Sequence, residues 1–166
     1  MERLWSPWRE KYIENINNKN KVCIFCTVFK ENRDKKNLIL LRGKFSYIIM
    51  NLYPYNSGHL LVVPNKHIPD LNSIEDEELF EMMKQTKMCV KILENVLSPA
   101  GFNIGINQGK VAGAGVEGHI HIHIVPRWNG DTNFMPVIGE TKVISQNLLS
   151  GYNKLKKQFD QFSNKI

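Results

Sequence analysis

The chain has 166 residues, enough for one domain that buries a sizeable core. Its composition, 42% hydrophobic and 23% charged, is typical of a globular domain and argues against a disordered or fibrous chain. No apolar run approaches the roughly 20 residues of a membrane-spanning helix, and the first residues lack the apolar centre of a signal peptide. We therefore expect a cytoplasmic protein with no membrane partner.

The net charge of +6 permits an anionic partner such as a nucleotide. By itself, however, this charge is better explained by Lys- and Asn-rich faces in contact with water. The Lys and Arg residues do not cluster into the basic groove that binds nucleic acid. We therefore expect no nucleic-acid partner.

Three strands are expected in the first half of the chain. Residues 38–41 and 45–52 are apolar runs on either side of a turn at 42–44, which predicts a hairpin. Residues 59–64 contain a continuous apolar run, which indicates a strand that is buried on both faces.

A long helix is expected next. Ser73 and Asp76 with a Glu-rich first turn indicate its start, and Ser98 followed by a proline indicates its end. Apolar positions recur every three or four residues and predict the buried face: Leu79, Met83, Thr86, Val90, Leu93 and Leu97. Cys89 is interpreted as a core side chain.

Two more strands and a helix complete the expected fold. Residues 102–107 and 119–125 alternate as strands do. A second helical face is predicted near the end, with Ser145 as its N-cap: Leu148, Tyr152, Leu155, Phe159 and Phe162. The order predicts an α+β fold with a mainly antiparallel sheet, one long central helix and a C-terminal helix.

The most informative stretch is G-H-I-H-I-H-I-V-P-R-W at 118–128. In a strand, His119, His121 and His123 share one face, and the isoleucines between them point into the core. Neutral imidazoles can ligate a metal, relay protons or attack phosphorus. The outer two alpha carbons lie about 13 Å apart at normal strand rise, so one metal ion would not readily bind all three rings. We therefore expect the three histidines to divide their roles.

Two further segments have the composition of binding sites. The loop at 107–118, N-Q-G-K-V-A-G-A-G-V-E-G, has glycines that allow backbone amides to approach an anion, although many hairpins carry such loops. Cys23 and Cys26 form a C-x-x-C pair with the spacing of two metal ligands. A redox pair or two inert thiols are the alternatives, and no thioredoxin-like pattern follows the cysteines.

The stretch H-I-H-I-H-I-V resembles the signature of the histidine triad (HIT) superfamily. N-S-G-H-L-L-V-V-P-N-K-H-I and N-Q-G…A-G-A-G resemble the upstream strand and phosphate loop of that family. M-E-R-L-W-S-P-W-R, V-P-R-W and G-D-T-N-F-M-P-V resemble the branch that includes bacterial diadenosine tetraphosphate phosphorylases. The resemblance implies one HIT-like domain over 1–166, with a core at 22–128, an N-terminal arm and a C-terminal helical extension, and a homodimer or higher homo-oligomer.

The resemblance also implies an enzyme that cleaves dinucleoside polyphosphates at the α-phosphate. His121 would form a nucleotidyl-histidine intermediate, released by water or phosphate, and His123 would hold the phosphate oxygens. His119, as a triad member, is counted among the catalytic residues. The positions implied to contact or support the substrate are Asn51, His59, Asn107, Gly113, Gly115 and Trp128.

In members that share the C-x-x-C pair, the resemblance implies a structural zinc ion, held here by Cys23, Cys26, His67 and His119. No organic cofactor is expected. The sequence departs from the family where many members have Gln-Ser or Gln-Thr, because Gly115 and Val116 stand there. Two alternatives remain open, a nucleoside phosphoramidase and a catalytically weak nucleotide-binding regulatory module.

Overall fold

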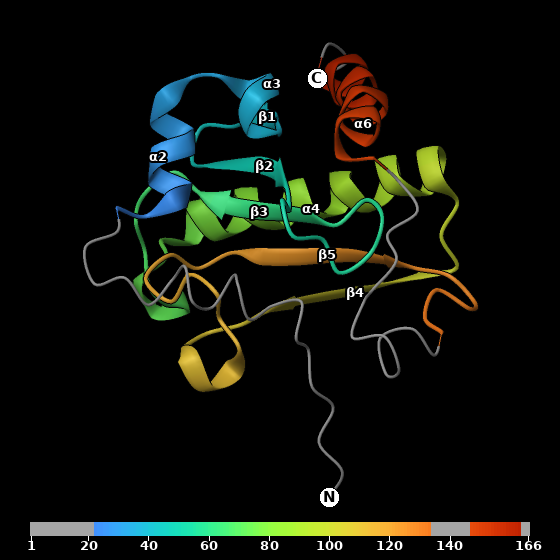
Figure 1. The fold of residues 1–166 in the computed structure, drawn as a ribbon. Coiled ribbons are helices and arrows are strands. Elements are labelled where there is room, and N and C mark those ends of the chain that lie inside the picture. Colours follow the sequence, from blue (N-terminus) through green and yellow to red (C-terminus); the bar gives the residue numbers. More distant parts are fainter. Residues whose placement is uncertain (1–21, 134–146, 164–166) are drawn as a thin grey trace, which may run out of the picture.

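An antiparallel five-stranded sheet forms the centre of the computed structural model, which describes residues 22–133 and 147–163 (Figure 1). The strand order is β1-β2-β3-β5-β4, with β1 at Ile39–Arg42, β2 at Ser46–Met50, β3 at Leu60–Pro64, β4 at Gly101–Ile106 and β5 at Ile122–Arg127. The helices are α2 (Ile24–Glu31), α3 (Asp34–Asn37), α4 (Asp76–Leu97) and α6 (Leu148–Ser163), with short 3₁₀ turns at Leu71–Ser73 and Lys110–Ala112. The predicted α+β fold, with one long helix and a C-terminal helix, is confirmed. None of these described helices is long and apolar enough to cross a membrane.

Side chains alternate between the two faces of the sheet and build a separate apolar cluster on each. On one face, Ile48, Leu60 and Ile124 belong to the cluster that includes side chains of α4 and α6. On the other face, Ile49 and Leu61 belong to a second cluster that includes Phe25 of α2 and Tyr47. As a result, β3 is buried along its whole length, as its continuous apolar run predicts.

The histidine stretch enters the sheet later than predicted. β5 begins at Ile122, because its pairing with β3 runs only from Val62↔Ile122 to Leu60↔Ile124. Before that point, the backbone N–H of Ile120 donates to the carbonyl of Ile68, outside β3. The isoleucines nevertheless lie in the core, as predicted: Ile120, Ile122 and Ile124.

The buried face of α4 differs from the prediction by about one residue. Met83 is 52% exposed, whereas its neighbour Met82 is fully buried. The predicted face omitted two buried polar side chains: Gln85 donates to the carbonyl of Ser46, and the Glu78 carboxylate pairs with a lysine. A pattern of apolar residues alone does not detect such polar contacts. The buried face predicted from it is therefore displaced around the helix by about one residue.

The start of α4 also differs from the prediction, whereas its end agrees. Ser73 closes a 3₁₀ turn, and α4 is capped by Glu75, which forms a capping box with Glu78. The helix ends at its C-cap Ser98, as predicted, and the backbone of Ser98 lies in the left-handed region. Cys89 is fully buried, in agreement with a core role.

The structure contains two N-terminal helices that the sequence analysis did not predict, α2 and α3. The N-cap of α2 is Cys23, whose side chain makes no capping hydrogen bond. The usual Ser, Thr, Asp or Asn signal of a helix start is therefore missing. The repeat of Phe25, Val28 and Phe29 at helical spacing was the only signal available.

The C-terminal helix buries the residues that its periodicity predicts. Tyr152, Leu155 and Phe159 are buried in the cluster shared with α4. The Tyr152 hydroxyl also donates to the carbonyl of Ile39 in β1, at 3.2 Å. The proposed N-cap, Ser145, and the N-terminal arm at 1–21 lie outside the described residues.

The close packing of the loop before β3 against α4 generates a stability prediction. Gly58 has a φ of +74°, and a Cβ there would lie 2.5 Å from Cδ1 of Leu97 and 3.1 Å from Cδ2 of Leu93. Gly130 has a similar φ of +75° with nothing within 4 Å. We expect Gly58→Ala to lower the free energy of unfolding by roughly 2–5 kcal/mol, and Gly130→Ala by roughly 1 kcal/mol.

Urea denaturation measures the free energy of unfolding of both variants, with the same slope of that free energy against urea concentration as in the wild type. Equal losses in the two variants would contradict the packing explanation, because both share the backbone cost of a positive φ.

Candidate active site and metal centre

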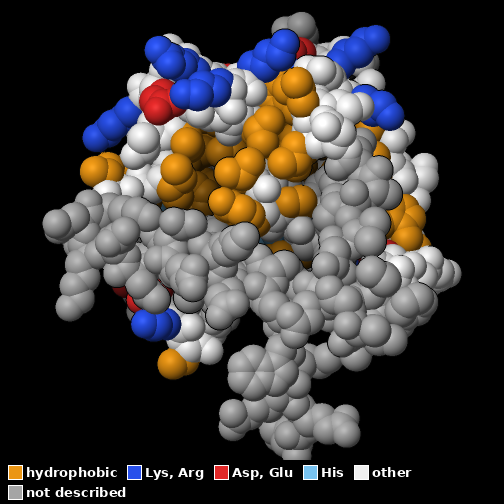
Figure 2. All heavy atoms as spheres, in the orientation of Figure 1, with side chains coloured by type: hydrophobic (Ala, Val, Ile, Leu, Met, Phe, Trp, Pro, Cys, Tyr) orange, Lys and Arg blue, Asp and Glu red, His pale blue; other side chains and the backbone are white. Residues whose placement is uncertain are grey.

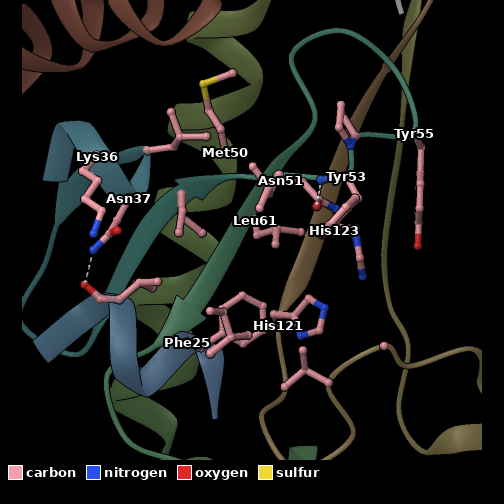
Figure 3. A pocket seen from close by; sticks show the side chains of 18 residues that line it. Phe25, Lys36, Asn37, Met50, Asn51, Tyr53, Tyr55, Leu61, His121 and His123 are labelled. Carbon is pink, nitrogen blue, oxygen red and sulfur yellow. Dashed lines mark hydrogen bonds between the residues drawn. The ribbon is translucent and has the colours of Figure 1, made fainter. Parts of the chain in front are cut away.

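A pocket of about 480 Å³ lies on the sheet face that α2 covers, within the size range of small-molecule sites. On the face shown in Figure 2, apolar side chains gather around a hollow, with Lys and Arg along one border. The close view in Figure 3 shows His121 and His123 toward one end of the pocket and Lys36 and Asn37 toward the other. Between them lie apolar side chains that include Phe25 and Leu61.

The His121 ring is oriented by a backbone carbonyl. Its Nδ1 lies 2.9 Å from the carbonyl oxygen of His119. A carbonyl can only accept, so Nδ1 carries the proton and Nε2 keeps its lone pair. The ring lines the pocket and is 5% exposed. His121 therefore has the tautomer that a nucleophile acting through Nε2 requires.

The tautomer of His123 follows from a chain of hydrogen bonds through His59. The backbone N–H of Tyr55 donates to Nδ1 of His59 at 3.0 Å, so neutral His59 carries its proton on Nε2. That Nε2 lies 3.0 Å from Nδ1 of His123 and donates to it. Neutral His123 therefore carries its own proton on Nε2. The two pocket histidines thus have opposite tautomers, one with a lone pair and one with a proton at Nε2.

Burial keeps the nucleophile candidate neutral. It lowers the pKa of His121 below the ordinary value, and the hydrogen bond to the His119 carbonyl opposes this only in part. Burial also lowers the pKa of His119, to about 4. An imidazole must be unprotonated at the attacking nitrogen, so a depressed pKa favours the reactive form at neutral pH.

A second group of side chains meets beside the pocket. The ligand atoms of Cys23, Cys26, His67 and His119 all lie within 4.8 Å of one another. The thiol of Cys23 lies 3.3 Å from Nδ1 of His119. The thiol of Cys26 lies 3.6 Å from the same nitrogen and 3.5 Å from Nδ1 of His67.

The three sulfur–nitrogen distances, 3.3, 3.5 and 3.6 Å, are close to those around a tetrahedral zinc ion. With Zn–S of about 2.3 Å and Zn–N of about 2.0–2.1 Å, a tetrahedral site places sulfur and nitrogen about 3.6 Å apart. Nε2 of His119 lies 2.9 Å from the carbonyl oxygen of Pro64 and therefore carries the proton. The lone pair of Nδ1 then faces the thiols. A metal-bound histidine typically donates its other N–H to a carbonyl in this way.

The two ring nitrogens of His119 face the thiols and the Pro64 carbonyl, and His119 is absent from the pocket lining. The direct catalytic role of His119 stays a prediction from the family resemblance, because the described pocket does not include this residue. Nε2 of His119 donates to the Pro64 carbonyl while Nδ1 faces the Cys23 thiol, an orientation that suits a metal ligand.

The structure brings some of the predicted substrate contacts together and separates others. Asn51 and Gly115 line the pocket with His121 and His123. His59 is 1% exposed and lies behind His123. Three predicted positions are outside the lining: Asn107, Gly113 and Trp128. Trp128 follows β5 at its far end, where its indole donates to the carbonyl of Ser98.

The loop before the first triad histidine is shaped by a 3₁₀ turn at Lys110–Ala112, flanked by Gly109 and Gly113 with positive φ. Only its later part, at Gly115 and Val116, reaches the pocket. The apolar wall contributed by α2 was not expected from the sequence, because this helix lacks the usual capping signal at its start.

Comparisons with known proteins show which family the chain resembles. The model of the HIT domain family matches residues 32–130. An AP-4-A phosphorylase of Mycobacterium tuberculosis is 40% identical over 152 residues, which span 88% of this chain and 78% of the relative. An asymmetrical bis(5'-nucleosyl)-tetraphosphatase of Schizosaccharomyces pombe is 36% identical over 93 residues, 56% of this chain and 50% of the relative.

A solved structure is similar as well. The crystal structure of a Zn-bound histidine triad family protein from Mycobacterium smegmatis has a TM-score of 0.70 and 26% sequence identity. It covers 87% of this chain and 97% of its own.

The cysteine–histidine group generates a metal-binding prediction. We expect purified protein, prepared without chelators, to hold one zinc ion per chain by elemental analysis. Cys26→Ala should weaken zinc binding by more than the roughly 10–100-fold typical of an outer-sphere change, because it removes a direct ligand. Competition with a chromophoric chelator measures the affinity.

Cys89→Ala is the matched control, because Cys89 is the remaining cysteine of the chain and is buried in the core. Wild-type affinity in Cys26→Ala, or its loss in Cys89→Ala, would contradict the assignment of the four ligands.

Proposed function

Because the chain belongs to the HIT domain family, we propose that this enzyme cleaves dinucleoside polyphosphates of the diadenosine tetraphosphate type at the α-phosphate, through a nucleotidyl-histidine intermediate. The observation that carries the proposal is the orientation of His121, whose protonated Nδ1 is held by the His119 carbonyl while the ring lines the pocket. The similarity to an AP-4-A phosphorylase supports the substrate class.

In the first step, Nε2 of His121 attacks the α-phosphorus. A P–N bond forms, the bond from this phosphorus to the bridging oxygen breaks, and the rest of the substrate leaves as a nucleoside polyphosphate. With diadenosine tetraphosphate, the leaving group is ATP and AMP remains on His121. The N–H of His123, held by His59, donates to a phosphate oxygen and stabilises the charge that develops there.

In the second step, an acceptor oxygen attacks the same phosphorus and the P–N bond breaks. Inorganic phosphate as acceptor yields ADP, and water yields AMP. Splitting the displacement into two steps lets a neutral imidazole do the first attack without prior activation of water.

The remaining side chains position the substrate. Asn51 lines the pocket beside His59 and faces the ribose in this proposal. Backbone at Gly115 lines the pocket near His121 and supplies donors to the phosphate. Asn107, Gly113 and Trp128 stay predictions from the family resemblance, because the described pocket does not include them.

Zinc at Cys23, Cys26, His67 and His119 has a structural role in this proposal, and no chemical step passes through it. Thiolate ligation needs reduced cysteines, and the described residues contain no disulfide among Cys23, Cys26 and Cys89. A reducing compartment, the cytoplasm, is therefore the proposed location.

One assay distinguishes the proposed function from a phosphoramidase and from a binding module. The protein is incubated with diadenosine tetraphosphate, with and without ³²P-labelled inorganic phosphate, and separately with an adenosine phosphoramidate. For a phosphorylase, the label should appear in the β-phosphate of ADP, because phosphate attacks the nucleotidyl-histidine. AMP and ATP without label indicate water as acceptor.

Cleavage of the phosphoramidate alone would overturn the proposal, as would the absence of turnover on every substrate. His121→Ala tests the nucleophile within the same assay. We expect turnover to fall by at least about 10³-fold while AMP still binds, because the variant loses the covalent step but keeps the pocket. Undiminished turnover would exclude His121 as the nucleophile.

The homodimer proposed from the family resemblance is supported by the edge of the sheet. Among the described strands, β4 pairs on one side only, and Ile104 on it is 50% exposed. An open edge of this kind can pair with a second copy. We expect light scattering to give twice the chain mass for the wild type, and the mass of one chain for Ile104→Lys.

Leu149→Lys is a matched control for this test, because Leu149 is 49% exposed but lies on α6. A monomeric wild-type protein, or an unchanged dimer in Ile104→Lys, would contradict the proposed interface.

A further inference from the structure

Helix α2 lies between the metal ligands and the pocket, and it contributes to both. Cys23 is its N-cap and Cys26 belongs to its first turn. Three side chains of the same helix line the pocket: Ile24, Phe25 and Val28. The two metal-ligating thiols and the apolar wall are therefore parts of one short segment.

Phe25 touches the metal group and the nucleophile candidate at once. Its ring lies edge-on to the His119 ring with centroids 5.4 Å apart, and 4.9 Å from the His121 ring. It is 7% exposed and lines the pocket (Figure 3). A shift of this ring would change the shape of the pocket beside the attacking nitrogen.

The two ends of α2 are held differently. At the C-terminal end, Nη1 of Arg42 donates to the carbonyl of Phe29, and Nδ2 of Asn37 donates to that of Val28. At the N-terminal end, the Tyr47 hydroxyl donates to the carbonyl of Phe25, but Cys23 provides no side-chain cap. An eight-residue helix is only marginally stable by itself.

The residues at the weakly capped end are the ones that would bind metal. An ion bound by Cys23 and Cys26 would connect the N-cap and the first turn to His67 and His119. We propose that metal binding at these four ligands sets the nucleotide affinity of the pocket, and that Phe25 is the positioning residue that transmits the effect. The inference rests on the proposed nucleotide-binding function of the pocket and on the proposed metal site.

Thermodynamic linkage makes the proposal quantitative. If zinc tightens nucleotide binding by some factor, the nucleotide must tighten zinc binding by the same factor. We expect AMP to bind about 10- to 100-fold more weakly after chelation, the range for loss of one phenyl contact. A structural metal without coupling to the pocket would leave both affinities independent.

The first experiment measures the dissociation constant of AMP by calorimetry, for the full chain with one zinc ion and after chelation. Far-UV circular dichroism should stay unchanged, and amide hydrogen exchange should accelerate in α2 after chelation. Titrating Zn²⁺ back should restore the affinity. The reciprocal measurement is the zinc affinity, by chelator competition, with and without AMP.

The second experiment uses a variant cycle. Phe25→Ala should weaken AMP binding in the zinc-loaded protein, and chelation should then change the affinity by less than about twofold, because the transmitting ring is gone. Phe29→Ala is the matched control: Phe29 is on the same helix and stacks on Tyr47, but does not line the pocket. It should keep the full response to zinc. Phe25→Leu replaces Phe25→Ala if the latter does not fold.

The proposal would be overturned by an AMP affinity unaffected by chelation, by an equal response to zinc in the Phe25 variant and the control, or by a chain that binds no zinc. Loss of far-UV signal on chelation would also overturn it, because the metal would then act on the whole fold. None of these measurements uses turnover. A protein that failed to cleave diadenosine tetraphosphate would contradict the proposed function and leave this test intact.

Discussion

The hydrogen bonds from histidine N–H groups to backbone carbonyls are the constraint on which the site depends. The Nε2–H group of His119 donates to the Pro64 carbonyl, and the Nδ1–H group of His121 donates to the His119 carbonyl. Because the two bonds use different ring nitrogens, the lone pairs face different groups, the thiols in one case and the pocket in the other. A backbone carbonyl cannot donate, so these tautomers cannot be exchanged without breaking the bond. Two adjacent members of one motif thereby acquire separate chemistry.

The two-sided sheet makes this division possible. Isoleucines of the histidine stretch pack with α4 and α6 on one face, while His121 and His123 lie on the other face, near Leu61 and α2. The core cluster anchors the backbone whose carbonyls orient the rings. The tautomer of His123 depends further on His59, which reaches it from the start of β3 and is itself oriented by a backbone N–H. Main-chain groups therefore orient the rings of His59, His119 and His121.

The match to the HIT domain model begins at residue 32 and so leaves out α2 with its C-x-x-C pair. The histidine motif and the sheet lie inside the match, whereas one wall of the pocket and two of the proposed metal ligands come from the segment before it. The similarity to the M. tuberculosis AP-4-A phosphorylase extends over 88% of the chain. The pocket histidines thus belong to the part that the family model covers, and the apolar wall beside them is added by a segment that also contributes two of the proposed metal ligands.

Periodicity alone determined most of the fold: the five strands, the long helix, the C-terminal helix and the burial of the isoleucines. One of its errors comes from a contact between distant segments. α4 buries Gln85, whose amide donates to the Ser46 carbonyl. The missed helix α2 has another cause, a missing local signal, because its N-cap Cys23 makes no capping hydrogen bond. The family resemblance predicts a metal site made by Cys23, Cys26, His67 and His119. It also places His119 among the catalytic residues, so this residue has two predicted roles. Only the tertiary structure decided which nitrogen of His119 faces the thiols, because the tautomer of a ring depends on the carbonyl that it meets. Here that carbonyl, of Pro64, lies 55 residues away in the chain.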